Sequence, residues 1–582
     1  MQCDYDPMHP APSAGADLRT PAAAPPFWPK ALPTEAHVPR TLLWENLEIA
    51  ARRYPDKVAY RVYGQDTSFG ALWRDAQRLA GWLQHRCALA PGDRVLLSGQ
   101  SSAQFATAFF AILRAGGIAV PVNPMYLADE FAHVAADSGA RMAIVAPELW
   151  TRIEPLLGRG VDHAVVFGYA RDADALDADT PGWFHAAPPA LADDRAVTLA
   201  AALDAAEVPR LPDRRADDLC LIAYTSGTTA RPKGCTQTHL SLMTGAVAPA
   251  LWRNDTADLV FLGASPMFHM QGLQIVNTTM YLGASMVLLP RWDTRRAAEL
   301  IATWRVNRFG ASPPMLLDLL ALPGLAPDAL ASVGVITGGG SVLAESVSQR
   351  LSDELEITYL EGWGMTETCS MAMCNPPRRT KRQCLGIPTF GVRALVVDPD
   401  TLEAYPDGPT PSAGELWVSA DQVSPHGYWN NDAANREAFV QRDGRRWLRT
   451  GDLVTRDADG YHFLVDRLKR MINAGGYKVW PSEVETLLHG HPAVQEACVV
   501  ATLDPRRGEQ VTAVLVLRPG ERLDAAAVID WARGRMAAYK CPRAVEFVER
   551  LPRAGTGKID WRGLQDGLRA RDASASARKE AA

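Results

Sequence analysis

The sequence lacks the features of a secreted, membrane-spanning or metal-clustered protein. Its nine cysteines include no Cys-x-x-Cys pair, so we expect reduced thiols rather than a disulfide framework or a zinc site. The most apolar stretch, residues 105–122, is interrupted by Arg114, Gly116 and Gly117, so it does not provide the roughly 20 apolar residues of a membrane span. The first residues show no basic segment followed by an apolar one, which predicts a cytoplasmic protein without a secretory signal.

A basic excess is also absent. The formal net charge is -6 at pH 7, whereas nucleic-acid-binding domains usually carry net positive charge, so we expect no nucleic-acid partner. With 582 residues the chain is too long for one compact core and should form two or more domains. Nothing in the sequence decides between a monomer and a homodimer. Peripheral contact with a membrane stays open, because it needs no transmembrane segment.

What the sequence does contain is a regular alternation of apolar strands with helical segments. Strands are expected at residues 93–98, 118–122, 141–146, 258–264, 285–289, 333–337 and 355–360. Helices are expected between them, at residues 101–114, 125–137, 271–281, 294–304 and 341–353. This order and spacing predict an α/β fold with doubly wound, mainly parallel sheets.

The last hundred residues follow another pattern and predict a small, mobile α+β domain. A helix opens at Pro481, a second is expected near 523–538, and strands are expected near 495–501, 511–517 and 544–549. The predicted division of the chain is a Pro- and Ala-rich, loosely attached leader (1–40), a large body (41–465), a hinge linker (466–470), the small domain (471–570) and a frayed tail (571–582).

One loop has the composition of a polyphosphate-binding site. Residues 224–234 read Tyr-Thr-Ser-Gly-Thr-Thr-Ala-Arg-Pro-Lys-Gly and follow an apolar strand at 219–223. Glycine exposes backbone N–H groups, and the hydroxyls and Lys233 add donors and positive charge for phosphate. The spacing is not that of a P-loop, and Gly555-Thr-Gly-Lys558 fails the same test because Pro552 stands where a glycine is required.

Residues 224–234 resemble the phosphate loop of the adenylate-forming superfamily, which comprises acyl-CoA synthetases, carrier-protein adenylation domains and beetle luciferases. The family loop usually has glycine where this chain has Ala230. The resemblance implies an enzyme with ATP, Mg²⁺ and coenzyme A among its ligands. The loop residues that it assigns to nucleotide binding are Thr225, Ser226, Gly227, Thr228, Thr229 and Lys233, and it gives Thr225 and Lys233 a catalytic role as well.

A second segment resembles the family's adenine and metal motif. It implies that the nucleotide is bound by Glu361, Gly362, Trp363, Gly364, Met365 and Thr366. In that family motif Trp363 would stack on the adenine, and Thr366 would hydrogen-bond a phosphate. Glu367 would be catalytic through Mg²⁺, which prefers hard carboxylate oxygens. A glycine run before it, Gly338, Gly339 and Gly340, resembles the loop on the adenine side, where glycine lets the backbone approach the base.

Three later segments continue the resemblance. Residues 448–452 resemble the ribose motif, in which Asp452 would accept from the ribose hydroxyls and Arg467 would contact ribose or phosphate. Lys469 falls on the family's hinge position, although taken alone it is an ordinary linker lysine. Gly475 and Gly476 resemble the segment that lines the pantetheine tunnel in fatty-acyl and related CoA ligases.

Two candidate catalytic residues lie apart from these segments. Lys558 resembles the lysine that reaches the carboxylate and the α-phosphate during adenylation. His269 resembles a residue that borders the acid pocket and shifts between the half-reactions, although an isolated histidine is more often structural.

Taken together, the resemblance implies an AMP-forming acid–thiol ligase with a carboxylic acid, ATP and CoA as its partners. A medium- or long-chain fatty acid is the favoured substrate. The alternatives are an aryl acid, a carrier protein as acceptor, a luciferase-like oxygenase and, from another class, a non-catalytic protein that binds acyl groups or nucleotides.

Overall fold

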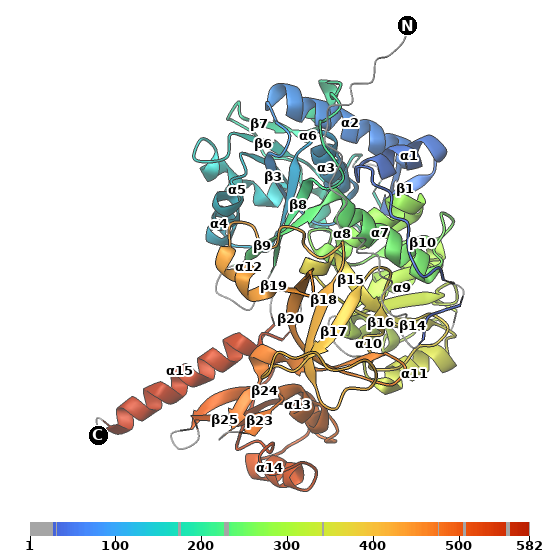
Figure 1. Cartoon of the computed structure of the whole chain (residues 1–582). Coiled ribbons are helices and arrows are strands. Elements are labelled where there is room, and N and C mark those ends of the chain that lie inside the picture. Colours follow the sequence, from blue (N-terminus) through green and yellow to red (C-terminus); the bar gives the residue numbers. More distant parts are fainter. Residues whose placement is uncertain are drawn as a thin grey trace.

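The computed structural model describes residues 27–30, 32–172, 176–225, 232–326, 328–339, 343–474, 477–504, 508–553 and 559–580. Within these ranges the chain forms three sheets in a large body and a fourth sheet in a small domain, which lies below the body in Figure 1. The α/β class predicted from the sequence is confirmed by parallel sheets covered with helices, beside a separate C-terminal domain.

The first sheet of the body is mainly parallel, and only its edge strand β9 runs antiparallel, against β8. In spatial order its strands are β7 (Ala196–Thr198), β6 (His163–Val166), β5 (Met142–Val145), β3 (Arg94–Ser98), β4 (Ile118–Val122), β8 (Leu219–Thr225) and β9 (Lys233–Thr238). The turn between β8 and β9 is therefore the predicted phosphate loop, held at the end of two paired strands.

The second sheet is parallel in its centre and antiparallel at both edges. Its strands, in spatial order, are β16 (Ile387–Pro388), β15 (Ser370–Cys374), β14 (Thr358–Met365), β13 (Val335–Gly338), β12 (Arg308–Ala311), β10 (Val260–Gly263), β11 (Ser285–Leu288), β1 (Val58–Val62) and β2 (Gln65–Ser68). Strand β14 extends past the predicted residue 360 and carries the Gly362–Met365 motif within it.

Helices fill the space between these two sheets and cover their outer faces (Figure 1). They are α1 (Glu45–Arg53), α2 (Phe69–Arg86), α3 (Ala103–Arg114), α4 (Ala128–Ser138), α5 (Trp150–Ile153), α6 (Leu199–Asp204), α7 (His239–Arg253), α8 (Met270–Leu282), α9 (Thr294–Trp304), α10 (Pro313–Leu320) and α11 (Glu345–Asp353). One hydrophobic cluster takes in α2, α3, α8 and strands of both sheets, so the two sheets share a core.

Helix α3 illustrates how the sequence sets these elements. Ser102 caps its start by accepting a hydrogen bond from the backbone N–H of Phe105. Every residue of α3 is buried, because the helix is apolar on all sides and packs between layers. Gly116 follows with φ +91°, a conformation that side chains disfavour, and ends the helix.

A third sheet, which the strand–helix alternation does not predict, closes the body. It is antiparallel and consists of β17 (Arg393–Val397), β18 (Gly414–Ser419), β20 (Arg445–Arg456), β19 (Phe439–Arg442) and β21 (His462–Arg467), with the short helix α12 (Asp432–Ala438) beside it. Side chains from this sheet and Trp363 of β14 form one hydrophobic cluster. The third sheet therefore packs directly against the predicted adenine-binding strand.

The small domain has its own sheet and core. Its elements are β22 (Ile472–Ala474), β23 (Tyr477–Val479), α13 (Pro481–His489), β24 (Val494–Asp504), β25 (Gly508–Leu517), α14 (Ala525–Arg533), β26 (Ala544–Phe547) and α15 (Trp561–Glu580). The sequence predicts a frayed tail from residue 571, but α15 continues to Glu580 and extends away from the domain (Figure 1).

The predicted leader, residues 1–40, is described only in part. From Phe27 onwards it packs on the body: the Trp28 ring meets the rings of Trp252 and Phe390 at 5.4 and 5.6 Å between centroids, and Phe27 stacks on Tyr461. This stretch therefore packs against the end of α7 and against Phe390 and Tyr461, which lie just outside the strands of the third sheet. No helix among the described residues is both long and apolar enough to cross a membrane.

Candidate active site

The two ends of the predicted phosphate loop lie side by side. Thr225 ends β8 and Lys233 begins β9, and the two are cross-strand partners. The Thr225 hydroxyl lies 3.4 Å from the Lys233 carbonyl oxygen, to which it donates. Ser226, Gly227, Thr228 and Thr229, together with Ala230, lie outside the described residues.

The return strand of this loop is held by a segment far along the chain. The Trp429 N–H donates to the Gly234 carbonyl at 2.7 Å, and the Thr236 N–H donates to the Gly427 carbonyl at 3.0 Å. Gly427 has φ +71°, so the chain makes a turn there that most side chains disfavour. The residue that follows, Tyr428, therefore lies beside Lys233 at the end of the loop.

Tyr428 is a site residue that the sequence analysis does not predict. Its hydroxyl donates to Glu367 Oε1 at 2.6 Å, and its ring centroid lies 5.3 Å from the Lys233 ammonium nitrogen. Burial, and then the Glu367 charge, raise the pKa of the Tyr428 hydroxyl, so this group stays protonated and remains a donor. An aromatic residue after a turn glycine, in Gly427-Tyr-Trp-Asn, is the signal that could have indicated it.

Glu367 provides a buried carboxylate beside the phosphate loop. It lies in a short 3₁₀ helix (Thr366–Thr368) after β14 and is 5% exposed. Gln237 of β9 donates to the Thr366 carbonyl at 2.8 Å, which fixes this turn against the loop strand. Among the described residues Glu367 forms no salt bridge, and a buried anion without a cationic partner is costly. A bound divalent cation would fit this donor, since Mg²⁺ commonly takes one or two carboxylates with phosphates and waters.

The glycine run ends strand β13 beside the start of the second motif. Gly338 pairs with Glu361 in register. A Cβ on Gly338 would stand 1.7 Å from the Tyr359 hydroxyl oxygen, and one on Gly339 would stand 3.0 Å from the Gly362 carbonyl oxygen. These two glycines therefore allow β13 and β14 to approach each other closely; Gly340 is outside the described residues.

Glu361 points into the protein and binds backbone groups. Its carboxylate accepts from the N–H of Leu343 and of Cys384, both at 3.2 Å, and the residue is 5% exposed. Burial raises the pKa of Glu361 to about 7, against the smaller opposing effect of the backbone N–H groups. Its contacts make Glu361 a support for the two loops that flank the adenine-side motif.

Trp363, Asp452 and Arg467 converge from two sheets. The Trp363 indole N–H donates to Asp452 Oδ2 at 2.8 Å, and Arg467 Nε lies 2.9 Å from Asp452 Oδ1. Asp452 and Arg467 are cross-strand partners on β20 and β21. Trp363 is 8% and Asp452 2% exposed. The predicted adenine-binding aromatic and the predicted ribose-binding carboxylate are therefore in direct contact. Gly364 is exposed beside them, and Met365 packs on the third sheet.

His269 caps the start of α8, where a close turn places it. Its N–H donates to the Pro266 carbonyl at 3.0 Å, and its ring lies 4.5 Å from the Phe268 ring centroid. Gly272 allows this turn, because a Cβ there would stand 2.1 Å from the Pro266 carbonyl oxygen. Further along α8, Gln271 and Ile275 pack against Gly310 of β12, where an added Cβ would stand 3.3 Å from Gln271 Nε2 and 3.6 Å from Ile275 Cδ1.

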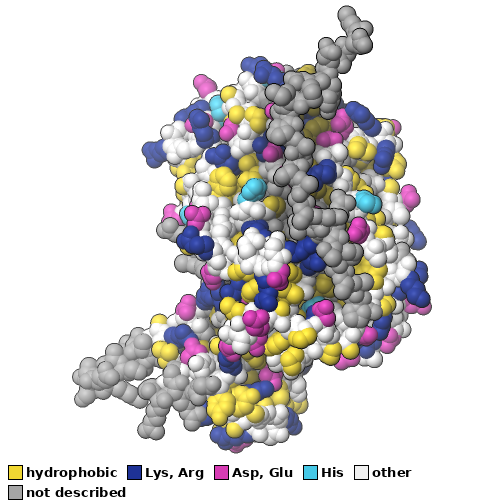
Figure 2. Space-filling model, in the orientation of Figure 1, with side chains coloured by type: hydrophobic (Ala, Val, Ile, Leu, Met, Phe, Trp, Pro, Cys, Tyr) yellow, Lys and Arg dark blue, Asp and Glu magenta, His cyan; other side chains and the backbone are white. Residues whose placement is uncertain are grey.

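The predicted hinge, residues 466–470, contains Arg467 and Lys469. Lys469 Nζ lies 3.1 Å from Glu437 Oε1 of α12, and both side chains are more than half exposed. On the small-domain side, Asp466 accepts from the N–H and the hydroxyl of Ser482 at 2.8 and 2.9 Å. Figure 2 shows basic and acidic side chains side by side where the body meets the small domain. Gly475, Gly476 and Lys558 lie outside the described residues.

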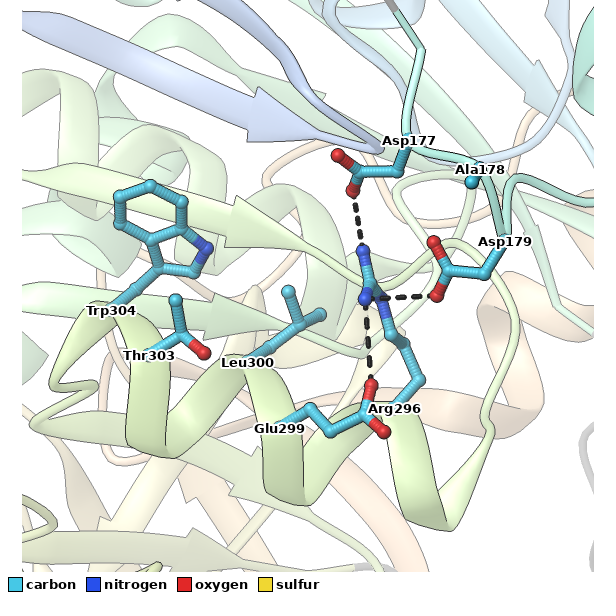
Figure 3. A pocket seen from close by; sticks show the side chains of 8 residues that line it. All are labelled: Asp177, Ala178, Asp179, Arg296, Glu299, Leu300, Thr303 and Trp304. Carbon is cyan, nitrogen blue, oxygen red and sulfur yellow. Dashed lines mark hydrogen bonds and ion pairs between the residues drawn. The ribbon is translucent and has the colours of Figure 1, made fainter.

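A surface pocket elsewhere on the body does not belong to this site. It has a volume of about 440 Å³ and lies between α9 and the segment 177–179 (Figure 3); a second pocket of about 270 Å³ shares Asp177 and Arg296 with it and reaches β1 and β2. Its Arg296 is paired with Asp177 at 2.6 Å, with Asp179 at 2.9 Å and with Glu299 at 3.4 Å. Five strand-to-strand steps of roughly 4.8 Å separate β1 from β14 in the second sheet. Arg296 is shared among three carboxylates of this pocket.

Two family models match the chain. The model described as "AMP-binding enzyme" matches residues 47–429, and the model described as "AMP-binding enzyme C-terminal domain" matches residues 483–558. The first range includes the phosphate loop, Glu367 and Tyr428. The second covers most of the small domain.

Curated proteins and solved structures match over nearly the same length. The chain is 30% identical to a long-chain-fatty-acid–CoA ligase of Bacillus subtilis, over 92% of this chain and 96% of that protein. It is 33% identical to a feruloyl-CoA synthase of Amycolatopsis sp, over 88% of this chain and 95% of that protein. The structure of ATP-bound MatB from Rhodopseudomonas palustris has a TM-score of 0.79 at 28% identity, over 91% of this chain and 99% of that one.

Proposed function

The chain belongs to the AMP-binding enzyme family, and from this premise we propose that it is an acid–thiol ligase. It activates a carboxylic acid with ATP to acyl-AMP and pyrophosphate, and then transfers the acyl group to CoA, which gives acyl-CoA and AMP. The observation that carries this proposal is that the predicted nucleotide-binding residues meet in two groups. One group is Trp363, Asp452 and Arg467, and the other is Lys233, Tyr428 and Glu367. The chain that holds them matches two CoA ligases over almost their full length.

The first step must bring two anions together. A carboxylate oxygen of the acid attacks the α-phosphorus of ATP, and the bond from that phosphorus to the bridging oxygen of pyrophosphate breaks. Lys233 supplies positive charge from the loop end, and Thr225 and Thr366 supply hydroxyls. Lys558 is assigned to the attacking carboxylate and the α-phosphate by its match to the family motif. Mg²⁺ held by Glu367 would offset the charge of the phosphates.

The second step needs access for a thiol. The CoA sulfur attacks the acyl carbon, the bond to the AMP oxygen breaks, and the thiol proton is released. A mixed anhydride hydrolyses in water, so the first step favours an enclosed site and the second an opened one. We assign the change to a rotation at Lys469. Its ion pair with Glu437 is exposed, so little stability is lost when the pair separates.

For the acid we propose a medium- or long-chain fatty acid. The support is the long-chain-fatty-acid–CoA ligase relative. An aryl acid is the second candidate, because the feruloyl-CoA synthase is as similar. A carrier protein remains the alternative acceptor.

The proposal is tested by pyrophosphate release from ATP and Mg²⁺ with a panel of fatty, aryl and short acids, with and without CoA. Turnover with one acid class that rises with CoA supports the proposal and identifies the substrate class. Pyrophosphate release that CoA leaves unchanged would point to a carrier protein. No release with any acid would overturn the enzyme assignment and favour a non-catalytic binding protein.

A further inference from the structure

The contact between Trp363 and Asp452 has a consequence for nucleotide recognition. Stacking on a base uses only the face of an aromatic ring, but here the edge of the indole is also engaged. Its N–H donates to a buried carboxylate at 2.8 Å, the length typical of a charge-assisted bond. The donor lies on β14 of the second sheet and the acceptor on β20 of the third sheet, so this bond also links the two sheets at the site.

The Asp452 carboxylate keeps unused acceptor capacity. An ionised carboxylate offers about four lone-pair positions. The indole takes one position on Oδ2. Arg467 Nε is 2.9 Å from Oδ1, yet no aligned hydrogen bond from the described residues reaches that buried oxygen. A buried acceptor without an aligned donor is costly unless a ligand supplies one. Two neighbouring hydroxyls of a ribose would supply two.

The two protein partners of Asp452 differ in how firmly they hold it. Trp363 is 8% exposed and its large ring is packed among the side chains of the third sheet. The Arg467 side chain is 50% exposed, and this residue is the last of β21 and lies within the predicted hinge segment, residues 466–470. An exposed charge pair is weakly held. When the small domain moves, Trp363 stays with the body, so it is the constant partner of the carboxylate.

We propose that Trp363 is a positioning residue for the ribose as well as a platform for the base. Its indole N–H holds the Asp452 carboxylate in the orientation that accepts both ribose hydroxyls, and this bond sets the preference of the protein for ribonucleotides over deoxyribonucleotides. The inference rests on the proposed function for the identity of the ligand, a nucleoside triphosphate. It differs from the family expectation for this position, in which the aromatic residue acts only on the base.

The test separates the N–H from the ring. Trp363→Phe keeps an aromatic face and removes the donor; replacement of Trp363 by benzothienylalanine, which has the shape of tryptophan without its N–H, serves if the Phe variant does not fold. The matched control is Trp417→Phe, because the buried Trp417 indole also donates to a carboxylate, Glu415 Oε2 at 2.9 Å, in the third sheet. Dissociation constants are measured by titrating ATP, 2′-deoxy-ATP and 3′-deoxy-ATP into each full-length protein, without any acid present.

In the parent protein, we expect ATP to bind roughly 10- to 100-fold more tightly than either deoxynucleotide, the effect of losing one hydrogen bond to a charged group. In Trp363→Phe that preference should fall to a few-fold, mainly through weaker binding of ATP. Trp417→Phe should keep the parent preference, even where its melting temperature falls.

The proposal is overturned if Trp363→Phe weakens all three nucleotides by the same factor, since that is the result of lost stacking alone. It is also overturned if the parent shows no ribose preference. Absence of any nucleotide binding would end the proposed function as well. Clear ribose preference without pyrophosphate release from any acid would instead leave this inference standing and reject the ligase assignment.

Discussion

Two clusters in the body are each built from a tryptophan, an arginine and a carboxylate, and they differ in how many acceptor positions they leave for a ligand. In one, Trp363 and Arg467 meet Asp452; in the other, Trp417 and Arg449 meet Glu415. Both carboxylates are 2% exposed. The clusters share a sheet, β20 contributing Asp452 to the first and Arg449 to the second.

The second cluster is saturated by the protein. Glu415 Oε2 accepts from the Trp417 indole at 2.9 Å and from Arg449 Nε and Nη2 at 3.1 and 2.9 Å, and Oε1 accepts from the Gly451 N–H at 3.2 Å. Asp452, by contrast, has one aligned donor, Trp363, and a second oxygen without one. The comparison suggests a rule for buried charged clusters. A structural role is indicated when protein donors hydrogen-bond every carboxylate oxygen, and a ligand-binding role is indicated when one oxygen has no donor.

The largest effect is expected when the cluster of Trp363, Asp452 and Arg467 loses its carboxylate. Asp452→Asn should lower kcat/KM for ATP by about 10²- to 10³-fold, because the amide accepts from ribose and Arg467 less strongly and loses the charge. The melting temperature should change little, since few protein donors depend on this carboxylate. Pyrophosphate-release kinetics and thermal unfolding check the two parts. A large loss of stability with unchanged kinetics would show that Asp452 is structural.

The same change in the saturated cluster should have the opposite profile. Glu415→Gln should cost about 2–3 kcal/mol of unfolding free energy, because the neutral side chain leaves Arg449 without its ion-pair partner and weakens the bond to Trp417. Urea unfolding measures this cost, and ATP binding should stay within a few-fold of the parent. If nucleotide affinity fell as far as in Asp452→Asn, the distinction between the clusters would not hold.

A third buried carboxylate sharpens the comparison through pH. Glu361 accepts from backbone N–H groups, and burial raises its pKa to about 7, well above the ordinary value for glutamate. The folded state therefore binds this proton more tightly, so stability falls as the pH rises from about 4.5 to about 7 and is constant above that range. Glu361→Gln should remove this pH dependence. Between pH 5 and pH 8 the parent should lose about 2 kcal/mol more unfolding free energy than the variant does. Melting curves at both pH values check it; parallel pH profiles for the two proteins would contradict it.

The smallest expected effect concerns Glu367, a carboxylate whose side-chain hydrogen-bond donor among the described residues is the neutral Tyr428 hydroxyl. Tyr428→Phe should lower kcat/KM by about 5- to 10-fold, because Glu367 loses the hydroxyl that orients it near the phosphates. The control is Tyr169→Phe, which removes a similar bond, from Tyr169 to Glu148 at 2.7 Å, away from the site. The Tyr169 variant should lose stability and keep its kinetics. Equal kinetic losses in both variants would make the Tyr428 contact a packing contact.

Much of the fold could be predicted from the sequence, and the physical reason is local. The alternation up to residue 360 gives the strand and helix positions of the first two sheets because apolar spacing reflects burial in a parallel sheet. The third sheet escapes the same reasoning, since its antiparallel strands are separated by irregular segments and, within the described residues, by only the short helix α12. Helix α15 escapes it too, because residues 571–580 carry no apolar stripe that predicts a packed helix.

The candidate site divides in the same way. The sequence by itself determined the family and the chemical groups: a hydroxyl-rich loop that ends in Lys233, a glutamate after Gly362–Thr366 and an aspartate at 452. These are short segments, and their residue types and spacing carry the information. Only the tertiary structure decided that Trp363 donates to Asp452, 89 residues away, and that Tyr428 donates to Glu367, 61 residues away. Such contacts depend on how separate sheets pack, and the burial that makes one unfilled acceptor significant exists only after they have packed.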